Sequence, residues 1–282
     1  MKAQSHERML LTYCFDDPNV NIALELFLRM IRDDLGEWLL SVLLYGSILF
    51  DDLSPGYGDL DFLAVVADDL DEPASERLTA LRAPLRSGEY GLYCQMIEGA
   101  FLPANMLSPD AQGKALWWGT TSERLWHKNQ LGPFVLHTIR EQGLVIWGED
   151  LRRRIPKIRK HEILQELLLH CTASRAHSKP TSLQCLDFLL TPARELLWLK
   201  TGKLSSKSEA ADWGYRNAKG EWRKHLPRAK FLRRNPQAAT CGDVQEWIRS
   251  LEPSILDATD ELEREVKRAM EREESAISSN RH

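Results

Sequence analysis

Two aspartates one residue apart, Asp59 and Asp61, open a short apolar run that ends at Val66. Because successive side chains of a strand point to opposite faces, this spacing predicts that both carboxylates project to one side while Leu60 enters the core. Two carboxylates at a strand end make a hard oxygen site that suits Mg²⁺, which is usually bound by few carboxylates and by the phosphates of a substrate. The sequence therefore predicts a magnesium site with Asp59 and Asp61 as ligands.

A glycine-serine pair, Gly46 and Ser47, follows the apolar run from Leu39 to Tyr45 and precedes the aspartates. The segment between the two motifs, 51–58, is rich in Asp, Ser, Pro and Gly and predicts a loop. Glycine allows the backbone to approach a ligand closely, and a serine hydroxyl can donate to a phosphate oxygen. Phosphoryl-type transfer needs a positioned triphosphate, neutralised charge and an aligned hydroxyl, and these motifs would supply the first two.

The remaining requirement is a base near the metal, for which Glu98 is the candidate. It ends a third predicted strand, which covers 91–97 and is bounded by Gly99 and Pro103, and adjacent strands would bring it near the aspartates. A carboxylate there could complete the metal site and accept the proton of the attacking hydroxyl. The alternative is that Glu98 is a solvated strand end, just as an isolated Asp-x-Asp is common in loops.

The two halves of the chain differ in pattern. The first half mixes predicted helices and strands, which indicates an α/β domain; the helices cover 19–34 and 72–86, and the strands 39–45, 62–66 and 91–97. The second half is helical by pattern over 162–177, 183–200 and 254–272, and Pro192 predicts a helix start or a kink. A basic, proline-containing segment, 152–160, predicts the junction. We therefore expect an α/β domain over 1–157 and a helical domain over 158–282.

The composition excludes several classes of protein. A formal net charge of -4 argues against a dedicated nucleic-acid binder. The five cysteines are scattered and form no C-x-x-C pair, which fits a reducing compartment and gives no support for a zinc site. The first 17 residues lack the apolar core of a signal peptide, and no stretch approaches the roughly 18 apolar residues of a membrane span. The expectation is a cytoplasmic protein.

The quoted motifs resemble those of a known superfamily. Leu44-Tyr-Gly-Ser, Asp59-Leu-Asp and a carboxylate on the following strand are similar to the DNA polymerase β-type nucleotidyltransferases. Within that superfamily, the chain resembles the aminoglycoside adenylyltransferases that modify streptomycin and spectinomycin. The run from Leu190 to Trp213 is similar to their C-terminal signature, in which an arginine, here Arg194, is followed by Thr-Gly-Lys, a lysine, here Lys207, and Ala-Ala-Asp-Trp.

This resemblance implies an α/β (α+β) nucleotidyltransferase domain with a mixed sheet, followed by an all-α helical bundle domain, with ligands between the domains. It implies AMP transfer from ATP, the co-substrate, to a hydroxyl of an aminoglycoside-type antibiotic, with Mg²⁺ as the cofactor. No nucleic-acid or membrane partner is implied, and a monomer is expected. The implied site residues are Asp59, Asp61 and Glu98 as catalytic residues and metal ligands, and Gly46, Ser47, Lys207 and Arg194 as nucleotide-binding residues.

Some features leave alternatives open. The segment 182–187 lacks the acidic cluster that streptomycin-modifying members present to their cationic drug, and Gln184 stands where a carboxylate is expected. The basic residues of 223–234 are interpreted as a solvated face or, alternatively, as a site for an acidic partner. Lys207 and Arg194 have a structural interpretation as exposed or helix-capping charges, and Arg194 as a packing residue. The same fold could adenylylate a metabolite, a protein or an RNA end, or could be a non-catalytic nucleotide-binding module.

Overall fold

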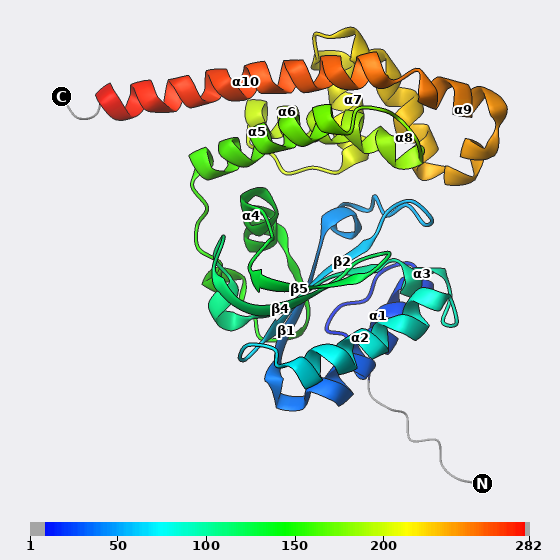
Figure 1. The fold of residues 1–282 in the computed structure, drawn as a ribbon, viewed down its shortest axis with the longest axis vertical. Coiled ribbons are helices and arrows are strands. Elements are labelled where there is room, and N and C mark those ends of the chain that lie inside the picture. Colours follow the sequence, from blue (N-terminus) through cyan, green and yellow to red (C-terminus); the bar gives the residue numbers. More distant parts are fainter. Residues whose placement is uncertain (1–8, 280–282) are drawn as a thin grey trace. The chain divides into compact units, whose positions relative to one another are not determined.

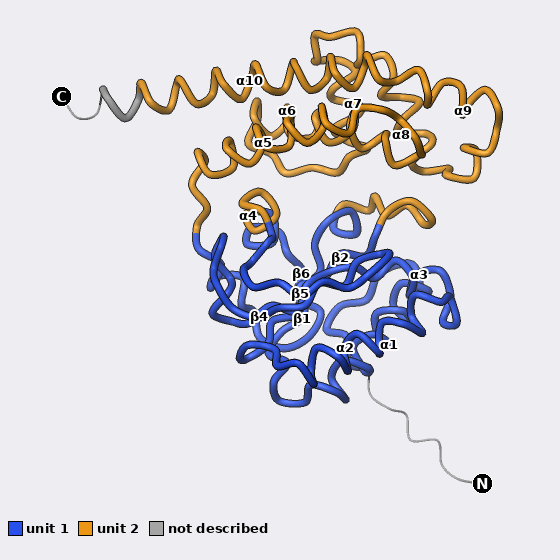
Figure 2. Tube along the Cα trace, viewed as in Figure 1, with its two compact units in different colours: residues 1–49, 59–131, 138–156 blue, residues 50–58, 132–137, 157–282 orange. Residues whose placement is uncertain are grey.

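The computed structural model describes residues 9–279, which form two compact units (Figure 2). Of the described residues, the first unit contains 9–49, 59–131 and 138–156, and the second contains 50–58, 132–137 and 157–279. The second unit thus contains the helical half of the chain and two short segments that precede it. None of the described helices is long and apolar enough to cross a membrane. Residues 1–8, part of the segment for which no signal peptide is predicted, lie outside the described residues.

A six-stranded sheet in the order β5-β4-β3-β2-β1-β6 forms the centre of the first unit. The strands are β1 Leu39–Tyr45, β2 Leu60–Val66, β3 Ile97–Pro103, β4 Gln112–Trp118, β5 Glu123–Lys128 and β6 Leu144–Gly148. The β2–β3 pair is parallel, and the other neighbouring pairs are antiparallel. The mixed sheet confirms the predicted fold class of this half.

Two helices, α1 (Pro18–Leu35) and α2 (Glu72–Ser87), lie together against one face of this sheet (Figure 1). The Phe27 ring of α1 lies 4.7 Å from that of Phe62 in β2 and 5.9 Å from that of Trp118 in β4. Aromatic pairs at such separations contribute to stability beyond the area they bury. Since side chains alternate along a strand, Asp61, the neighbour of Phe62, projects to the opposite face.

The predicted strand over 91–97 is wrong. Leu92–Gln95 forms the short helix α3, and the strand begins only at Ile97. Gly99, which was expected to bound the strand, lies inside it. The position requires glycine because a Cβ there would overlap the backbone oxygen of Phe62. Glu98 therefore lies at the start of β3 and not at the end of a strand. The remaining helix of this half is α4, Pro133–Gln142.

The second unit is helical apart from its loops. Its helices are α5 Lys160–Ala176, α6 Asp187–Thr201, α7 Lys207–Asn217, α8 Leu226–Arg234, α9 Gly242–Arg249 and α10 Glu252–Ser279. The long helix α10 packs along α5 and α6 (Figure 1). Of the helix start or kink expected at Pro192, the start is wrong, because α6 begins at Asp187 and continues through the proline. Short 3-10 turns occupy Gly36–Trp38, Gly46–Phe50, Ala104–Met106, Arg152–Arg154, Leu183–Leu186, Glu221–His225 and Pro236–Thr240.

Candidate active site

The carboxylates of the predicted metal site lie at neighbouring ends of β2 and β3. Asp61 is in register with Glu98 across the parallel pair, and with Tyr45 on its other side in β1. Neighbouring strands are about 4.8 Å apart, and residues in register project to the same face. Asp61 and Glu98 are therefore side by side. Asp59 precedes β2 by one residue, and Leu60 between the two half-buried aspartates is fully buried, as the alternation predicts.

Gly46 directly follows β1 and lies against Asp61. Its φ of +76° is in the left-handed region, and a Cβ at this position would overlap Oδ2 of Asp61. Only glycine satisfies both conditions without strain. Ser47 follows in the turn Gly46–Phe50 and is half-buried. The structure thus brings the glycine-serine turn and Asp61 together.

Tyr45 is part of this group of residues, although its sequence context did not predict a role for it. It is 7% exposed. Burial raises the pKa of its hydroxyl well above the ordinary range, and the charges of Asp61, Glu98 and Asp59 raise it further. All three carboxylates therefore act on one phenol, which stays neutral. The available signal was its position within the motif Leu44-Tyr-Gly-Ser.

Glu98 combines partial burial with one strong hydrogen bond. The backbone N–H of Thr120, just beyond β4, donates to Oε2 of Glu98 at 2.8 Å. Burial raises the pKa of Glu98 above its ordinary value, and the bonds from Thr120 offset this only in part. A carboxylate with a raised pKa and a fixed orientation is suited to accept a proton near neutral pH.

Arg82 of α2 is a further charged residue near this end of the sheet. It is fully buried and donates to the carbonyl oxygens of Cys94 at 3.3 Å and Gln95 at 2.9 Å, just before β3. Burial, together with the charge of Arg86, lowers the pKa of Arg82 to about 10, while Glu98 and Asp59 act in the opposite direction. The i, i+4 spacing from the buried Leu78 was the sequence signal that Arg82 faces the core.

The fit of Mg²⁺ to these residues depends on the number of ligands. No group of three or more His, Cys, Asp or Glu side chains within residues 9–279 is arranged to hold a metal ion. Two aspartates completed by substrate phosphates and water remain a suitable donor set, because Mg²⁺ is commonly bound in that way. Asp59 and Asp61 therefore fit the metal, whereas Glu98 as a third ligand stays a prediction.

Lys207 and Arg194, the other predicted nucleotide-binding residues, belong to the second unit. Lys207 is the first residue of α7, and its Nζ lies 2.8 Å from Oδ1 of Asp187. The guanidinium carbon of Arg194 lies 5.7 Å from the centre of the Phe134 ring, a contact typical of a packing arginine. Neither contact tests nucleotide binding, which stays a prediction for both residues.

The basic segment 223–234 is not simply a solvated face. Five of its residues form ion pairs with acidic side chains: Lys224 with Glu221, Arg228 with Asp243, Lys230 with Asp212, and Arg233 and Arg234 with Asp52. Arg233, which was interpreted as solvated, is only 2% exposed. It forms an ion pair with the buried Asp52, so its charge is compensated inside the unit.

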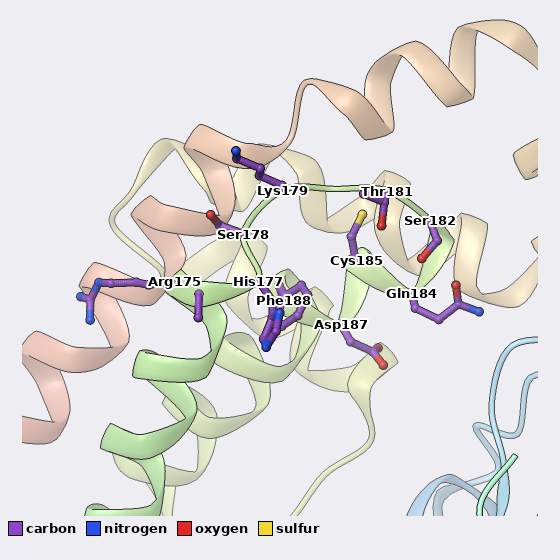
Figure 3. Close-up of a pocket in the computed structure, with 11 residues that line it drawn as sticks. Arg175, His177, Ser178, Lys179, Thr181, Ser182, Gln184, Cys185, Asp187 and Phe188 are labelled. Atoms are coloured by element: carbon purple, nitrogen blue, oxygen red, sulfur yellow. The ribbon is translucent and has the colours of Figure 1, made fainter. Parts of the chain in front are cut away.

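A pocket of about 740 Å³ in the second unit lies between the end of α5 and the start of α6 (Figure 3). Arg175, His177 and Lys179 line it with the polar residues of 181–184. Of the described residues in this lining, only Asp187 is acidic, and it is the partner of Lys207. Gln184 and Asp187 extend to the same side in Figure 3. The neutral amide of Gln184, at the position where a carboxylate was expected, thus lies in the lining of this pocket.

Comparison with known protein families finds a match in the second half of the chain. Residues 155–258 match the family model "Aminoglycoside adenylyltransferase, C-terminal domain". This part of the second unit is therefore similar to the C-terminal domain of the aminoglycoside adenylyltransferases. The match contains the whole signature from Leu190 to Trp213. None of the curated protein sequences matches the chain.

Solved structures extend the likeness to the whole fold. The spectinomycin adenyltransferase AAD(9) from Enterococcus faecialis, solved with ATP and spectinomycin, matches with a TM-score of 0.63 and 17% identity, over 87% of this chain and 98% of its own. A MntA–HpeT toxin–antitoxin structure matches with a TM-score of 0.27 and 15% identity, over 53% of this chain and 92% of its own, which is too low to show a shared fold. The domain match and the AAD(9) fold together support a nucleotidyltransferase, and the chain is similar in part to the aminoglycoside adenylyltransferases.

Proposed function

We propose that this nucleotidyltransferase transfers AMP from ATP to a hydroxyl group of an aminoglycoside-type antibiotic, with Mg²⁺ held by Asp59 and Asp61. The observation that carries the proposal is the register of Asp61 with Glu98, beside the Gly46 turn. This register provides a metal-binding carboxylate and a base on adjacent strands. The aminoglycoside adenylyltransferase domain in the same chain supports the acceptor class.

In this proposal Glu98 takes the proton from the acceptor hydroxyl. The oxygen then attacks the α-phosphorus of ATP, the new O–P bond forms, and the bond to the β-phosphate oxygen breaks to release pyrophosphate. Glu98 is suited to this role because burial raises its pKa, while the Thr120 N–H fixes one carboxylate oxygen. General-base catalysis of this kind accelerates reactions by about 10²- to 10⁴-fold.

Gly46 and Ser47 would hold the triphosphate, because the left-handed backbone at Gly46 leaves no side chain between the turn and Asp61. When bound, Mg²⁺ would neutralise charge on the phosphates and on the departing pyrophosphate. Tyr45 stays protonated among the three carboxylates and keeps a neutral donor there. Lys207 would add a positive charge for the triphosphate, which requires it to leave Asp187.

The preferred acceptor is expected to carry little positive charge. A polycationic drug gains affinity from clustered carboxylates. The pocket at the end of α5 offers Asp187, already paired with Lys207, among cationic and neutral residues. We therefore expect weakly charged relatives of spectinomycin, the ligand in the AAD(9) structure, to be used in preference to polycations.

Two alternatives are less well supported. Transfer to an RNA end would need a basic surface, and three cations of the segment 223–234 have acidic side chains beside them that reduce the charge of this surface. A non-catalytic module would be favoured if Glu98 lay far from the aspartates, whereas Glu98 is in register with Asp61 on the adjacent strand. A metabolite or protein acceptor remains distinguishable by experiment.

The test is pyrophosphate release from MgATP in the presence of single antibiotics, from spectinomycin to polycationic aminoglycosides. Release is expected with a hydroxylated antibiotic and not without one. Asp59→Ala is the inactive variant, and Asp33→Ala, on the exposed side of α1, is the matched control that should behave as wild type. MgATP binding without release for any antibiotic would reject this acceptor class. Full activity of Asp59→Ala would reject the metal assignment.

A further inference from the structure

The loop between the two predicted ligand-binding motifs belongs to the second unit. Residues 50–58 group with the helical half (Figure 2), while the chain on either side of them is part of the first unit. The loop follows Gly46 and Ser47 at one end and leads into Asp59 and Asp61 at the other. Contacts that fix this loop therefore constrain both motifs through the chain itself.

A buried ion pair is the principal contact of this loop. Asp52 and Arg233 are each 2% exposed, and Nη1 of Arg233 lies 3.0 Å from Oδ2 of Asp52. The same guanidinium donates to Oγ of Ser54 and to the carbonyl oxygen of Asp52, both at 2.9 Å. Arg234 adds a second contact with Oδ1 of Asp52 at 3.2 Å. Three acceptors on one loop are thus held by a single arginine of α8.

The loop is also bound to the beginning of α7. The backbone N–H of Ser208 donates to Oδ2 of Asp52 at 3.1 Å. The hydroxyl of Tyr57 donates to Oδ1 of Asp187 at 3.1 Å, and the same oxygen lies 2.8 Å from Nζ of Lys207. The loop therefore contacts the residue after Lys207 and, through Asp187, the Lys207 side chain. This is the lysine predicted to reach the triphosphate.

A buried ion pair is a weak stabiliser compared with well-packed apolar residues, because both charges lose their hydration. Such pairs instead favour one arrangement of the groups around them, because the planar guanidinium of arginine forms its hydrogen bonds only with acceptors in fixed positions. Burial raises the pKa of Asp52, but the bonds from Ser208 and the charge of Arg233 outweigh it and leave this pKa below the usual value. Asp52 therefore stays ionised and bound to Arg233 at neutral pH.

We propose that Asp52 and Arg233 are positioning residues for ATP, which fix the loop 50–58 within the second unit and thereby restrain, through the chain itself, the glycine-serine turn and the aspartates that would bind the triphosphate. The inference rests on the proposed function for its kinetic consequence. Its structural part, the dependence of the loop and the adjoining motifs on Arg233, does not depend on any activity.

The test compares Arg233→Met and Arg233→Lys with Arg228→Met, a control on the same helix whose ion pair with Asp243 is exposed. Loss of the Arg233 guanidinium in Arg233→Met should raise KM for MgATP by about tenfold or more, with a smaller effect on KM for the acceptor. Arg233→Lys keeps the charge but not the fork and should lie between Arg233→Met and wild type. Arg228→Met should match wild type.

Hydrogen exchange of the peptides covering 46–61, without nucleotide, provides the readout that is independent of turnover. Exchange there should be faster in Arg233→Met than in wild type or Arg228→Met. A folded Arg233→Met with wild-type exchange and wild-type KM for MgATP would overturn the proposal, even if its melting temperature fell. If Arg233→Met does not fold, Tyr57→Phe, which removes only the bond to Asp187, should show the same changes at smaller size, and unchanged exchange would overturn it. A wild-type protein without turnover would reject the proposed function but leave the exchange test intact.

Discussion

Two carboxylates removed from water, one in each unit, have pKa values displaced in opposite directions. Glu98 in the first unit has a raised pKa because burial outweighs its bonds from Thr120. Asp52 in the second unit is more deeply buried, yet its pKa is lowered because Ser208 and Arg233 more than offset burial. Burial alone therefore does not decide the protonation of either group; the partners do.

The difference extends to the neighbourhoods of the two residues. Around Glu98, three carboxylates gather with Arg82 as a nearby positive charge, and Asp59, Asp61 and Glu98 all raise the pKa of Tyr45. Around Asp52, opposite charges are matched. Gathered like charges cost folding energy and are typical of sites that bind cations or exchange protons. Matched charges are typical of structural contacts. We infer that the first arrangement serves chemistry and the second serves positioning.

Asp61→Asn is the variant with the largest expected effect on this contrast. It should abolish AMP transfer, because the remaining aspartate cannot hold the metal with the phosphates alone. Its melting temperature should be equal to or above that of wild type, since one of three like charges is removed. Asp52→Asn should show the reverse in stability and lose about 3 kcal/mol, as expected when a buried pair is broken. Calorimetry of both variants, with pyrophosphate release, makes the comparison.

Two results would contradict the distinction between Asp61 and Asp52. An Asp61→Asn protein much less stable than wild type would mean that this carboxylate has a structural role like that of Asp52. Substantial turnover by Asp61→Asn, with Asp33→Ala again as the surface control, would remove Asp61 from the metal site.

Glu98→Gln should lower kcat by about 10²- to 10⁴-fold while MgATP still binds. The wild-type rate should fall as the pH is lowered through the raised pKa of Glu98, because only the ionised form accepts a proton. This acidic limb should lie above the pH at which an ordinary glutamate titrates, and it should disappear in Glu98→Gln. Rate-pH profiles between pH 4.5 and 9, with nucleotide binding measured by calorimetry, would check both parts.

The exposed Glu76 of α2 provides the matched control, and Glu76→Gln should keep both the rate and the limb. If Glu98→Gln retains the same acidic limb, the titrating base is another residue. At neutral pH the glutamine should not destabilise the fold, because the charge that it removes is disfavoured by burial.

Much of the first unit was predictable because local pattern determines it. The strand Leu39–Tyr45 was predicted with its observed bounds, and the alternation around Leu60 predicted the burial of this residue between two half-buried aspartates. Such features depend on residues close in sequence. The third strand was misplaced because Gly99 and Pro103 are local breakers of a strand, whereas here tertiary packing against Phe62 requires glycine.

The contacts of the loop 50–58 could not be predicted in this way. Arg233 contacts the backbone of Asp52 across 181 positions, and no periodicity relates the two residues. Arg233 lies in a segment of many cations, so composition favoured a solvated interpretation. Its burial follows from the packing of α8 against the loop. A contact between residues so far apart in sequence can be predicted only with a structure or with aligned relatives.

Gly46→Ala should have an intermediate effect. A side chain at a positive φ costs about 1–3 kcal/mol, and here it would also overlap Oδ2 of Asp61. We expect a lower melting temperature together with a loss of MgATP affinity, because Asp61 or the turn must move. Gly36→Ala, at a positive φ with no atom within 4 Å of its Cβ, is the control for backbone strain alone. Equal MgATP affinity in the two variants would show that the contact with Asp61 has no part in binding.

The smallest expected effect concerns a matched pair of the second unit, His170 with Glu195. Nδ1 of His170 lies 2.7 Å from Oε1 of the buried Glu195. Burial lowers the pKa of His170, but the hydrogen bonds that its ring donates to Glu166 and Glu195, with the charges of these carboxylates, raise it to about 10. Since this pKa is raised above the value of about 6.5 expected in the unfolded chain, the contribution to stability is complete below pH 6.5 and is lost as the pH rises through about 10.

The His170 side chain is 41% exposed, so solvent screening should limit its contribution to about 1 kcal/mol or less. The free energy of unfolding of wild type should therefore fall between pH 6.5 and 10 by slightly more than that of His170→Asn. His127→Asn, at an exposed position of β5, should keep the wild-type slope. If the free energy of unfolding changes with pH equally in wild type and in His170→Asn, the ion pair of His170 with Glu195 does not contribute to stability, in contrast to the expectation for Asp52 with Arg233.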